Sequence, residues 1–89
     1  MSDYKVVYHR NALKDAANLE SNGILKKKVK DLIDIVTNDP YQNPPPYKHL
    51  VGNLKGLISR RINIQHRLVY EVREQEKTVV IMRMWSHYE

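Results

Sequence analysis

The C-terminal half of the sequence contains the side-chain types that bind and cleave RNA. If the runs beginning at His66 and Thr78 are strands, their side chains alternate between two sheet faces. One face then carries Arg67, Arg83, Trp85 and His87. Arginine gives bidentate hydrogen bonds to phosphate, tryptophan stacks on an unpaired base, and histidine transfers protons near neutral pH. We therefore expect an open, RNA-binding sheet face.

The charge of the 89-residue chain is positive and unevenly spread. There are 15 Lys and Arg against 10 Asp and Glu, for a formal net charge of +5, and no acid lies between Tyr41 and Tyr70. The basic residues and histidines of that stretch are Lys48, His49, Lys55, Arg60, Arg61, His66 and Arg67. Such a surface binds polyanions through counterion release. An excess of cations that serves only solubility is the alternative.

Several classes of chemistry are excluded by composition. The chain has no cysteine, which excludes disulfides, thiolate nucleophiles and cysteine metal sites. The histidines, His9, His49, His66 and His87, have no metal-binding spacing, and no phosphate-binding glycine loop is present. We expect neither metal nor cofactor. Because no long apolar run or leader segment is found, we also expect a cytoplasmic protein without a membrane partner.

Two helices are predicted in the first half of the chain. The first begins near Asn11, a candidate N-cap, with its stripe at Leu13, Ala16, Ala17 and Glu20. Ser21-Asn22-Gly23 ends it and caps the second helix, whose apolar stripe is Leu25, Val29, Leu32, Ile33 and Val36. The second helix is expected to end at Asn38-Asp39-Pro40.

Strands account for the rest of the predicted fold. Tyr4–Tyr8 is an opening strand, 41–55 a proline-rich connection, and 57–64, 66–74 and 78–88 are strands with a turn at 74–77. On the last strand we expect Val80, Met82 and Met84 to face the helices. The fold class is α+β, of order β-α-α-β-β-β, with a mostly antiparallel sheet and two helices packed on one face. Residues 1–89 are expected to form a single domain.

Four segments carry a family resemblance. Lys48-His49-Leu50, Ser59-Arg60-Arg61-Ile62, His66-Arg67-Leu68-Val69-Tyr70 and His87-Tyr88 occur in the order and at the separations found in YoeB/Txe toxins. The chain therefore resembles this branch of the RelE-like toxins of bacterial type II toxin–antitoxin systems. The resemblance implies a metal-independent endoribonuclease that cuts translated mRNA in the ribosomal A site. It also implies a YefM/Axe-like antitoxin as partner, operator DNA reached only through that antitoxin, and leaves a homodimer open.

The resemblance also assigns roles to individual residues. The family reaction is attack of a ribose 2′-hydroxyl on the adjacent phosphate, which requires a base, a cation and an acid. By motif position Arg67 is the phosphate-stabilising cation, His87 the general acid, and Tyr88 the aromatic that positions the nucleotide. The RNA-binding residues implied are Lys48, His49, Arg60, Arg61, His66 and Trp85.

The sequence departs from the family pattern around this site. The general-base glutamate of the family is replaced by Pro45, a frequent acid before the His-Arg pair by Gln65, and a basic residue near the end by Trp85, while Glu89 extends the terminus. Three hypotheses stay open. The chain is a ribonuclease whose base is His87, His49 or ribosomal RNA; it is a non-catalytic inhibitor that occupies the ribosome; or it is an RNA-binding or regulatory module acting with its antitoxin.

Overall fold

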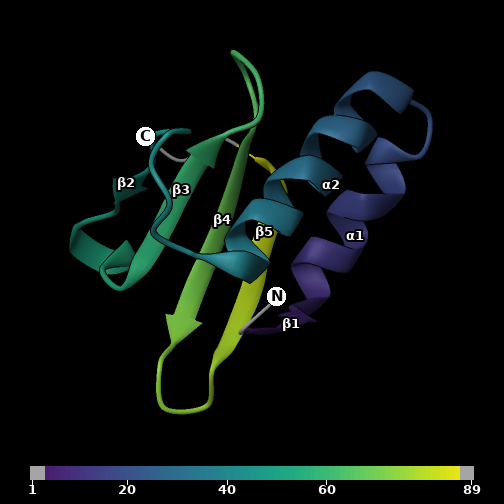
Figure 1. Ribbon diagram of the computed structural model, residues 1–89. Coiled ribbons are helices and arrows are strands. Elements are labelled where there is room, and N and C mark those ends of the chain that lie inside the picture. The colour runs from purple at the N-terminus through teal and green to yellow at the C-terminus, as the bar shows by residue number, and fades with distance from the viewer. Residues whose placement is uncertain (1–3, 87–89) are drawn as a thin grey trace.

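A strand, two helices and a run of strands follow one another in the computed structural model, which describes residues 4–86 (Figure 1). The elements are β1 (Lys5–Tyr8), α1 (Arg10–Leu19), α2 (Gly23–Asn38), β2 (Lys48–His49), the 3-10 helix η1 (Gly52–Leu54), β3 (Leu57–Arg61), β4 (Arg67–Arg73) and β5 (Thr78–Ser86). The predicted order is confirmed for the six larger elements. Within the connection expected to be extended, the structure adds β2 and η1.

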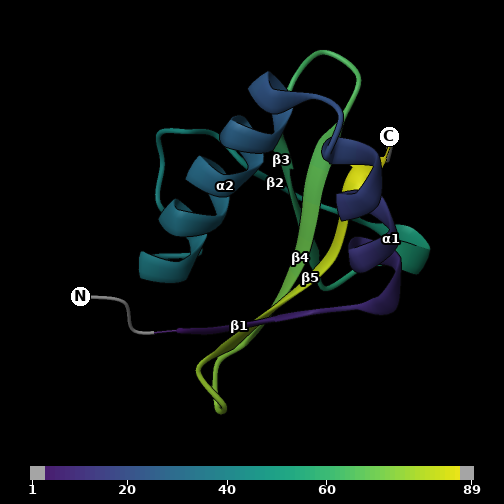
Figure 2. The same cartoon turned by 90° about the vertical axis from the view of Figure 1, so that its right-hand side faces the viewer.

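The strands form one sheet of order β1-β5-β4-β3-β2. The β2–β3, β3–β4 and β4–β5 pairs are antiparallel, but β1 pairs with β5 in parallel. The sheet is therefore mostly antiparallel, as predicted, and β1–β5 is its parallel pair. A parallel pair needs a long connection, and the chain between β1 and β5 contains both helices and the other strands. Figure 2 shows β1 crossing beside β5 and leading directly into α1.

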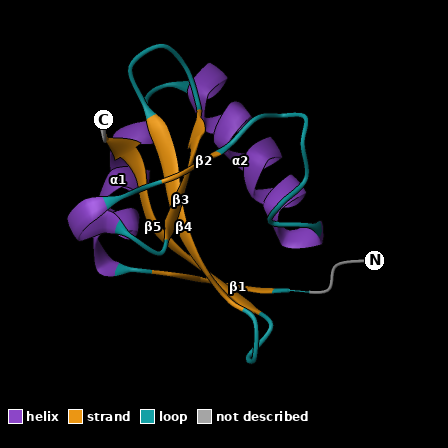
Figure 3. Ribbon diagram, turned by 90° about the vertical axis from the view of Figure 1, so that its left-hand side faces the viewer, coloured by secondary structure: helices purple, strands orange, loops and turns teal. Residues whose placement is uncertain are grey.

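Both helices pack on one face of the sheet, as predicted, and Figure 3 shows them behind the strands. The core between the layers is apolar and is made by Ala12, Leu19, Leu25, Val29, Val36, Ile58, Ile62, Leu68, Tyr70, Val79, Ile81 and Met84. The opposite sheet face is the one available for a ligand. Within residues 4–86, neither helix has the length and apolar character needed to cross a bilayer.

The helices differ from the prediction in two respects, both of them in α1. Asn22 caps α2 through a hydrogen bond from the Leu25 amide, as expected. The N-cap of α1, however, is His9 rather than Asn11, and its Nδ1 accepts the Asn11 amide at 3.0 Å. Helix α1 also buries a different stripe from the predicted one. Leu13 is 59% exposed, whereas Ala12, Asp15 and Leu19 are buried.

The side-chain parity predicted for β5 is wrong at Val80 and confirmed at Met84, because the strand is irregular. Val79 and Ile81 belong to the core. Val80 therefore faces away from the helices, contrary to the prediction. Tyr70 is opposite Ile81 whereas Val69 is opposite Arg83, which leaves an extra residue on β5. A β-bulge of this kind reverses the alternation of the residues after it. Met84 consequently returns to the core.

Candidate nucleic-acid interface

A groove of about 430 Å³ lies where the sheet meets the proline-rich loop. It is lined by Pro46, Tyr47, Lys48, Ser59, Arg61 and Arg67. Three residues singled out from the sequence, Lys48, Arg61 and Arg67, are therefore brought together from three strands. We refer to this set of lining residues as the basic groove.

The strand register explains why the three cations converge. Lys48 is opposite Ser59 on β3, and Arg61 is opposite Arg67 on β4. Because residues two apart on a strand share a face, Ser59 and Arg61 bring their cross-strand partners to the same side. No ion pair involves Lys48, Arg61 or Arg67 within the part of the chain that the structure describes. With no acid in its lining, the groove concentrates positive potential, which attracts phosphate.

Arg60 does not belong to this surface, and its predicted RNA contact is wrong. The residue is only 1% exposed, because position 60 lies on the helix side of β3 with Ile58. Its guanidinium donates to the Tyr70 hydroxyl at 3.0 Å, and it also donates to three backbone carbonyls of the loop, those of Pro40 (3.0 Å), Gln42 (2.9 Å) and Pro45 (2.6 Å). Arg60 therefore fixes the loop that forms one wall of the basic groove.

The Tyr70 hydroxyl completes this buried network. It accepts the Arg60 bond and donates to the Pro40 carbonyl at 2.7 Å. Burial raises the pKa of Tyr70 above its usual value, although the Arg60 bond and charge act in the opposite direction. The phenol is therefore neutral at physiological pH and keeps its proton for Pro40. A loop so rich in proline has few amides of its own, so these side chains supply its donors.

The two predicted histidines within the described chain lie beside the basic groove. His49 is exposed on β2, and its ring meets that of Tyr47 edge-on with the centroids 5.6 Å apart. His66 is half-buried, and its carbonyl accepts the amides of Ile62 and Asn63. These two hydrogen bonds close the turn between β3 and β4, and Arg67 follows it directly. Neither residue lines the groove, and their RNA contacts stay predictions.

The structure describes the C-terminal candidate residues only in part. Trp85 lies on β5, and its side chain is outside the described part of the structure, as are His87 and Tyr88 entirely. The last described residue, Ser86, is opposite Arg67 in the sheet. The chain thus reaches the strand position beside Arg67 one residue before His87.

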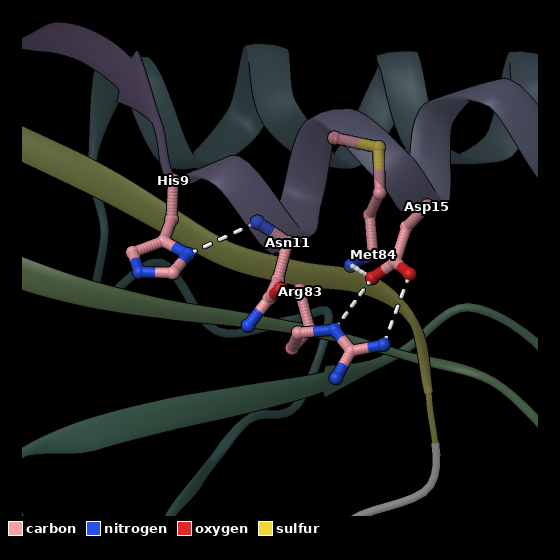
Figure 4. Close-up of polar contacts among 5 residues, drawn as sticks. All are labelled: His9, Asn11, Asp15, Arg83 and Met84. Atoms are coloured by element: carbon pink, nitrogen blue, oxygen red, sulfur yellow. Dashed lines mark hydrogen bonds and ion pairs between the residues drawn. The ribbon is translucent and has the colours of Figure 1, made fainter.

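Arg83 was expected on the open face, but an acid of α1 binds it. Its Nε and Nη2 donate to the Asp15 carboxylate at 2.8 and 3.0 Å (Figure 4). The same carboxylate accepts the Met84 amide at 3.0 Å. Asp15 is 3% exposed, so its charge is compensated by two arginine donors and one backbone donor. Arg83 therefore does not contribute a further cation to the basic groove.

Sequence reasoning missed Asp15 and Tyr70 and misassigned Arg60. One signal was available for Asp15, because Ala12, Asp15, Ala16 and Leu19 follow the spacing of a buried helix stripe with an acid inside it. A buried acid needs a cationic or amide partner. For Arg60 the signal was parity with Ile58 and Ile62, which places it on the apolar side of its strand.

A metal centre has no support within residues 4–86. No group of three His, Cys, Asp or Glu side chains there is arranged to hold an ion. The chemistry available to the basic groove is the electrostatic binding of phosphate by arginine and lysine.

The comparisons with known proteins agree with this picture. A family model described as the YoeB-like toxin of bacterial type II toxin–antitoxin systems matches residues 8–88. The curated Toxin YoeB of Synechocystis sp. is 35% identical over 65 residues, which are 73% of each chain.

Solved structures share the fold over nearly the whole chain. The YoeB/ParE toxin from Agrobacterium tumefaciens has a TM-score of 0.86 at 26% identity, over 94% of this chain and 99% of that one. A YoeB–YefM complex from Staphylococcus aureus gives 0.79 at 29% identity, over 96% and 98%. A YoeB dimer from the same organism gives 0.80 at 26% identity, over 98% and 100%.

Proposed function

Because the chain belongs to the YoeB-like toxin family of bacterial type II toxin–antitoxin systems, we propose that it is a ribosome-dependent endoribonuclease. It cleaves mRNA in the A site and thereby stops translation. The observation that carries the proposal is the basic groove, in which Lys48, Arg61 and Arg67 converge without an acid. Three cations at the end of a rigid sheet are suited to holding the phosphates on either side of a scissile bond.

The proposed reaction needs no cofactor. The 2′-oxygen attacks phosphorus, the bond from phosphorus to the 5′-oxygen breaks, and the products are a cyclic phosphate and a 5′-hydroxyl. Arg67 offsets the charge that grows on the phosphoryl oxygens. His87 protonates the departing 5′-oxygen and Tyr88 positions the nucleotide, an assignment supported by the pairing of Ser86 with Arg67. Lys48 and Arg61 bind the flanking phosphates.

The general base is the open part of this mechanism. Position 45 holds proline, and its carbonyl accepts a bond from Arg60. His87, His49 and ribosomal RNA are the candidate acceptors of the 2′-proton. Since Pro46 lines the basic groove, a carboxylate introduced at position 45 begins one residue from it. Pro45→Glu should therefore raise the single-turnover rate, and Pro45→Ala is the control for loss of the ring. Equal rates for the two variants would exclude this loop as the place for a base.

The test of the function is primer extension on mRNA translated in a purified system. We expect new 5′ ends at A-site codons, unchanged when EDTA is added under conditions that preserve ribosomes. Arg67→Met should reduce cleavage by about 10²-fold or more. The matched control is Arg73→Met, which removes the same charge from the far end of β4, where Arg73 pairs with Glu71. Equal loss from both variants would contradict a local role for Arg67.

Inhibition by occupancy is the second candidate, and the acid-free lining of the basic groove favours it. A groove that binds RNA but lacks a proton acceptor holds the mRNA without cutting it. In the same assay this function gives arrested ribosomes and no new 5′ ends. His87→Gln separates the two, because it should abolish cleavage by the enzyme and leave occupancy intact.

The partner that we propose is a cognate antitoxin with an acidic segment that covers the basic groove. Support comes from the S. aureus relative, which is solved in complex with YefM. A charge-driven complex weakens with salt and with charge reversal. Arg67→Glu should lower affinity for the antitoxin much more than Arg73→Glu does. An affinity that does not respond to ionic strength would contradict the proposal.

A further inference from the structure

The outer edge of β5 is covered first by strand β1 and then by helix α1. Strand β1 pairs with it only from Thr78 to Ile81, and the last backbone bond of that run joins the His9 amide to the Ile81 carbonyl at 2.9 Å. Beyond this point α1 begins. The Met84 amide, on the same strand, then donates to Asp15. Asp15 thus supplies an acceptor where the neighbouring strand has ended (Figure 4).

The position of this contact coincides with the bulge. The register of β5 on β4 shifts between Ile81 and Arg83 and shifts again before Ser86. A shift of one residue exchanges the faces of all side chains that follow. Asp15 holds both residues on the far side of the first shift, Arg83 by its guanidinium and Met84 by its amide.

We infer that Asp15 is a positioning residue for the C-terminal catalytic segment, an inference that rests on the proposed function. By binding Arg83 and Met84, Asp15 fixes the bulged register in which Ser86 pairs with Arg67. His87 and Tyr88 follow Ser86 directly in the sequence, so the register sets where the described chain ends relative to Arg67. Misplacing reacting groups by about 1 Å can cost about 10²-fold in rate. Asp15 contacts no basic-groove residue in any hydrogen bond or ion pair of the described chain.

The experiment compares graded variants in single-turnover cleavage of ribosome-bound mRNA. Asp15→Ala removes every acceptor and should lower the maximal rate by about 10²-fold. Asp15→Asn keeps one carbonyl oxygen for the Met84 amide and should lower it by about tenfold. Toxin concentration at half-maximal rate should stay within about twofold, because the basic groove is unchanged. Asp31→Asn, the same change on an exposed acid of α2, is the matched control.

A second measurement reports the register without any activity. In ¹⁵N-labelled protein, Asp15→Ala should remove the exchange protection of the Met84 amide and weaken the cross-strand contacts between Arg67 and Ser86. Where Asp15→Ala fails to fold, Asp15→Asn and Arg83→Lys provide both measurements. An Asp15 variant that folds with wild-type rate, or with an unaltered register, overturns the inference. A wild-type chain that cuts no mRNA refutes the proposed function alone, and the register measurement then still decides whether Asp15 holds the strand.

Discussion

Two buried charges, Arg60 and Asp15, hold backbone in two regions of the molecule, and they are compensated differently. Arg60 lies under the loop and has only neutral acceptors, three carbonyls and the Tyr70 hydroxyl. Asp15 lies under the edge of β5 and has a cationic partner, Arg83, that is 31% exposed, besides one amide. Each charge orders backbone that has no regular partner. The comparison indicates that both charges hold irregular backbone, Arg60 in the loop beside the groove and Asp15 at the edge of β5.

The difference lies in what happens when each charge is removed. Without Arg60, the carbonyls of Pro40, Gln42 and Pro45 lose a buried donor and the loop has few amides to replace it. Without Asp15, Arg83 can still reach water, and a single amide loses its acceptor. A lost partner costs most where the group left behind stays buried. We therefore expect the loop side to be the more sensitive one.

The largest effect is expected from Arg60→Met. It removes the donor of the Gln42 and Pro45 carbonyls and leaves that of Pro40 with the Tyr70 hydroxyl. We expect a loss of about 3 kcal/mol in the free energy of unfolding. Urea denaturation measures it. Arg61→Met is the matched control, because Arg61 is adjacent to Arg60 but exposed. This substitution should change the free energy of unfolding by less than about 0.5 kcal/mol. Similar losses for the two variants would mean that the Arg60 network contributes little.

A smaller loss is expected from Asp15→Asn. One oxygen still accepts the Met84 amide, but the charged, bidentate pair with Arg83 is lost. We expect about 2 kcal/mol less stability, discounted for the partial exposure of Arg83. The same denaturation experiment measures it, beside Asp31→Asn. A loss larger than that of Arg60→Met would reverse the comparison between the two sides.

Sequence patterns predicted the parts of the fold that repeat regularly. The stripe on α2, the alternation on β4 and the turn at 74–77 follow from periodicity, and the structure agrees. The parallel pairing of β1 does not follow from it, because it depends on contact between segments far apart in the chain, and the bulge in β5 does not, because it interrupts the alternation itself. Parity therefore misplaced Val80, and it did not reveal that Arg83, which pairs with Val69, binds Asp15.

The residues of the candidate site were likewise predicted only in part. The family motif identified Lys48, Arg61 and Arg67, and strand register brings these three together. It also included Arg60, because two adjacent arginines look alike in a motif although they face opposite sides of a strand. His87 and Tyr88 lie outside the described residues, so their proposed roles rest on the motif and on the pairing of the preceding residue, Ser86, with Arg67.

Tyr70→Phe tests whether the Arg60 network acts as a unit. The phenylalanine keeps the packing but removes a hydroxyl that joins Arg60 to the Pro40 carbonyl. We expect a loss of about 1 kcal/mol. In the Arg60→Met background the same change should cost clearly less, because the shared partners are already disturbed. Additive losses in this double-mutant cycle would show that the two side chains act independently.

The smallest effect is expected at the far end of the loop, where two tyrosines meet Glu74. Its carboxylate accepts the hydroxyls of Tyr41 at 2.9 Å and Tyr4 at 3.0 Å. Partial burial, together with the hydrogen bond to Glu74, raises the pKa of Tyr41 from 10.0 to about 12. The folded chain therefore keeps a proton that the unfolded chain loses above pH 10. The stabilisation from this hydroxyl is complete below pH 10 and disappears as pH rises toward 12.

Tyr41→Phe should accordingly cost less than about 1 kcal/mol at pH 8, and its difference from wild type should shrink between pH 10 and 12. Absorbance titration should show that the variant lacks a tyrosine ionising near pH 12. Glu74→Gln keeps both tyrosines and should move that ionisation back toward 10, because the carboxylate that opposes the phenolate is gone. Tyr8→Phe, which removes an exposed tyrosine from β1, is the control. A stability difference that stays constant from pH 8 to 12 would exclude the raised pKa of Tyr41, and with it the Glu74 contact, as the cause.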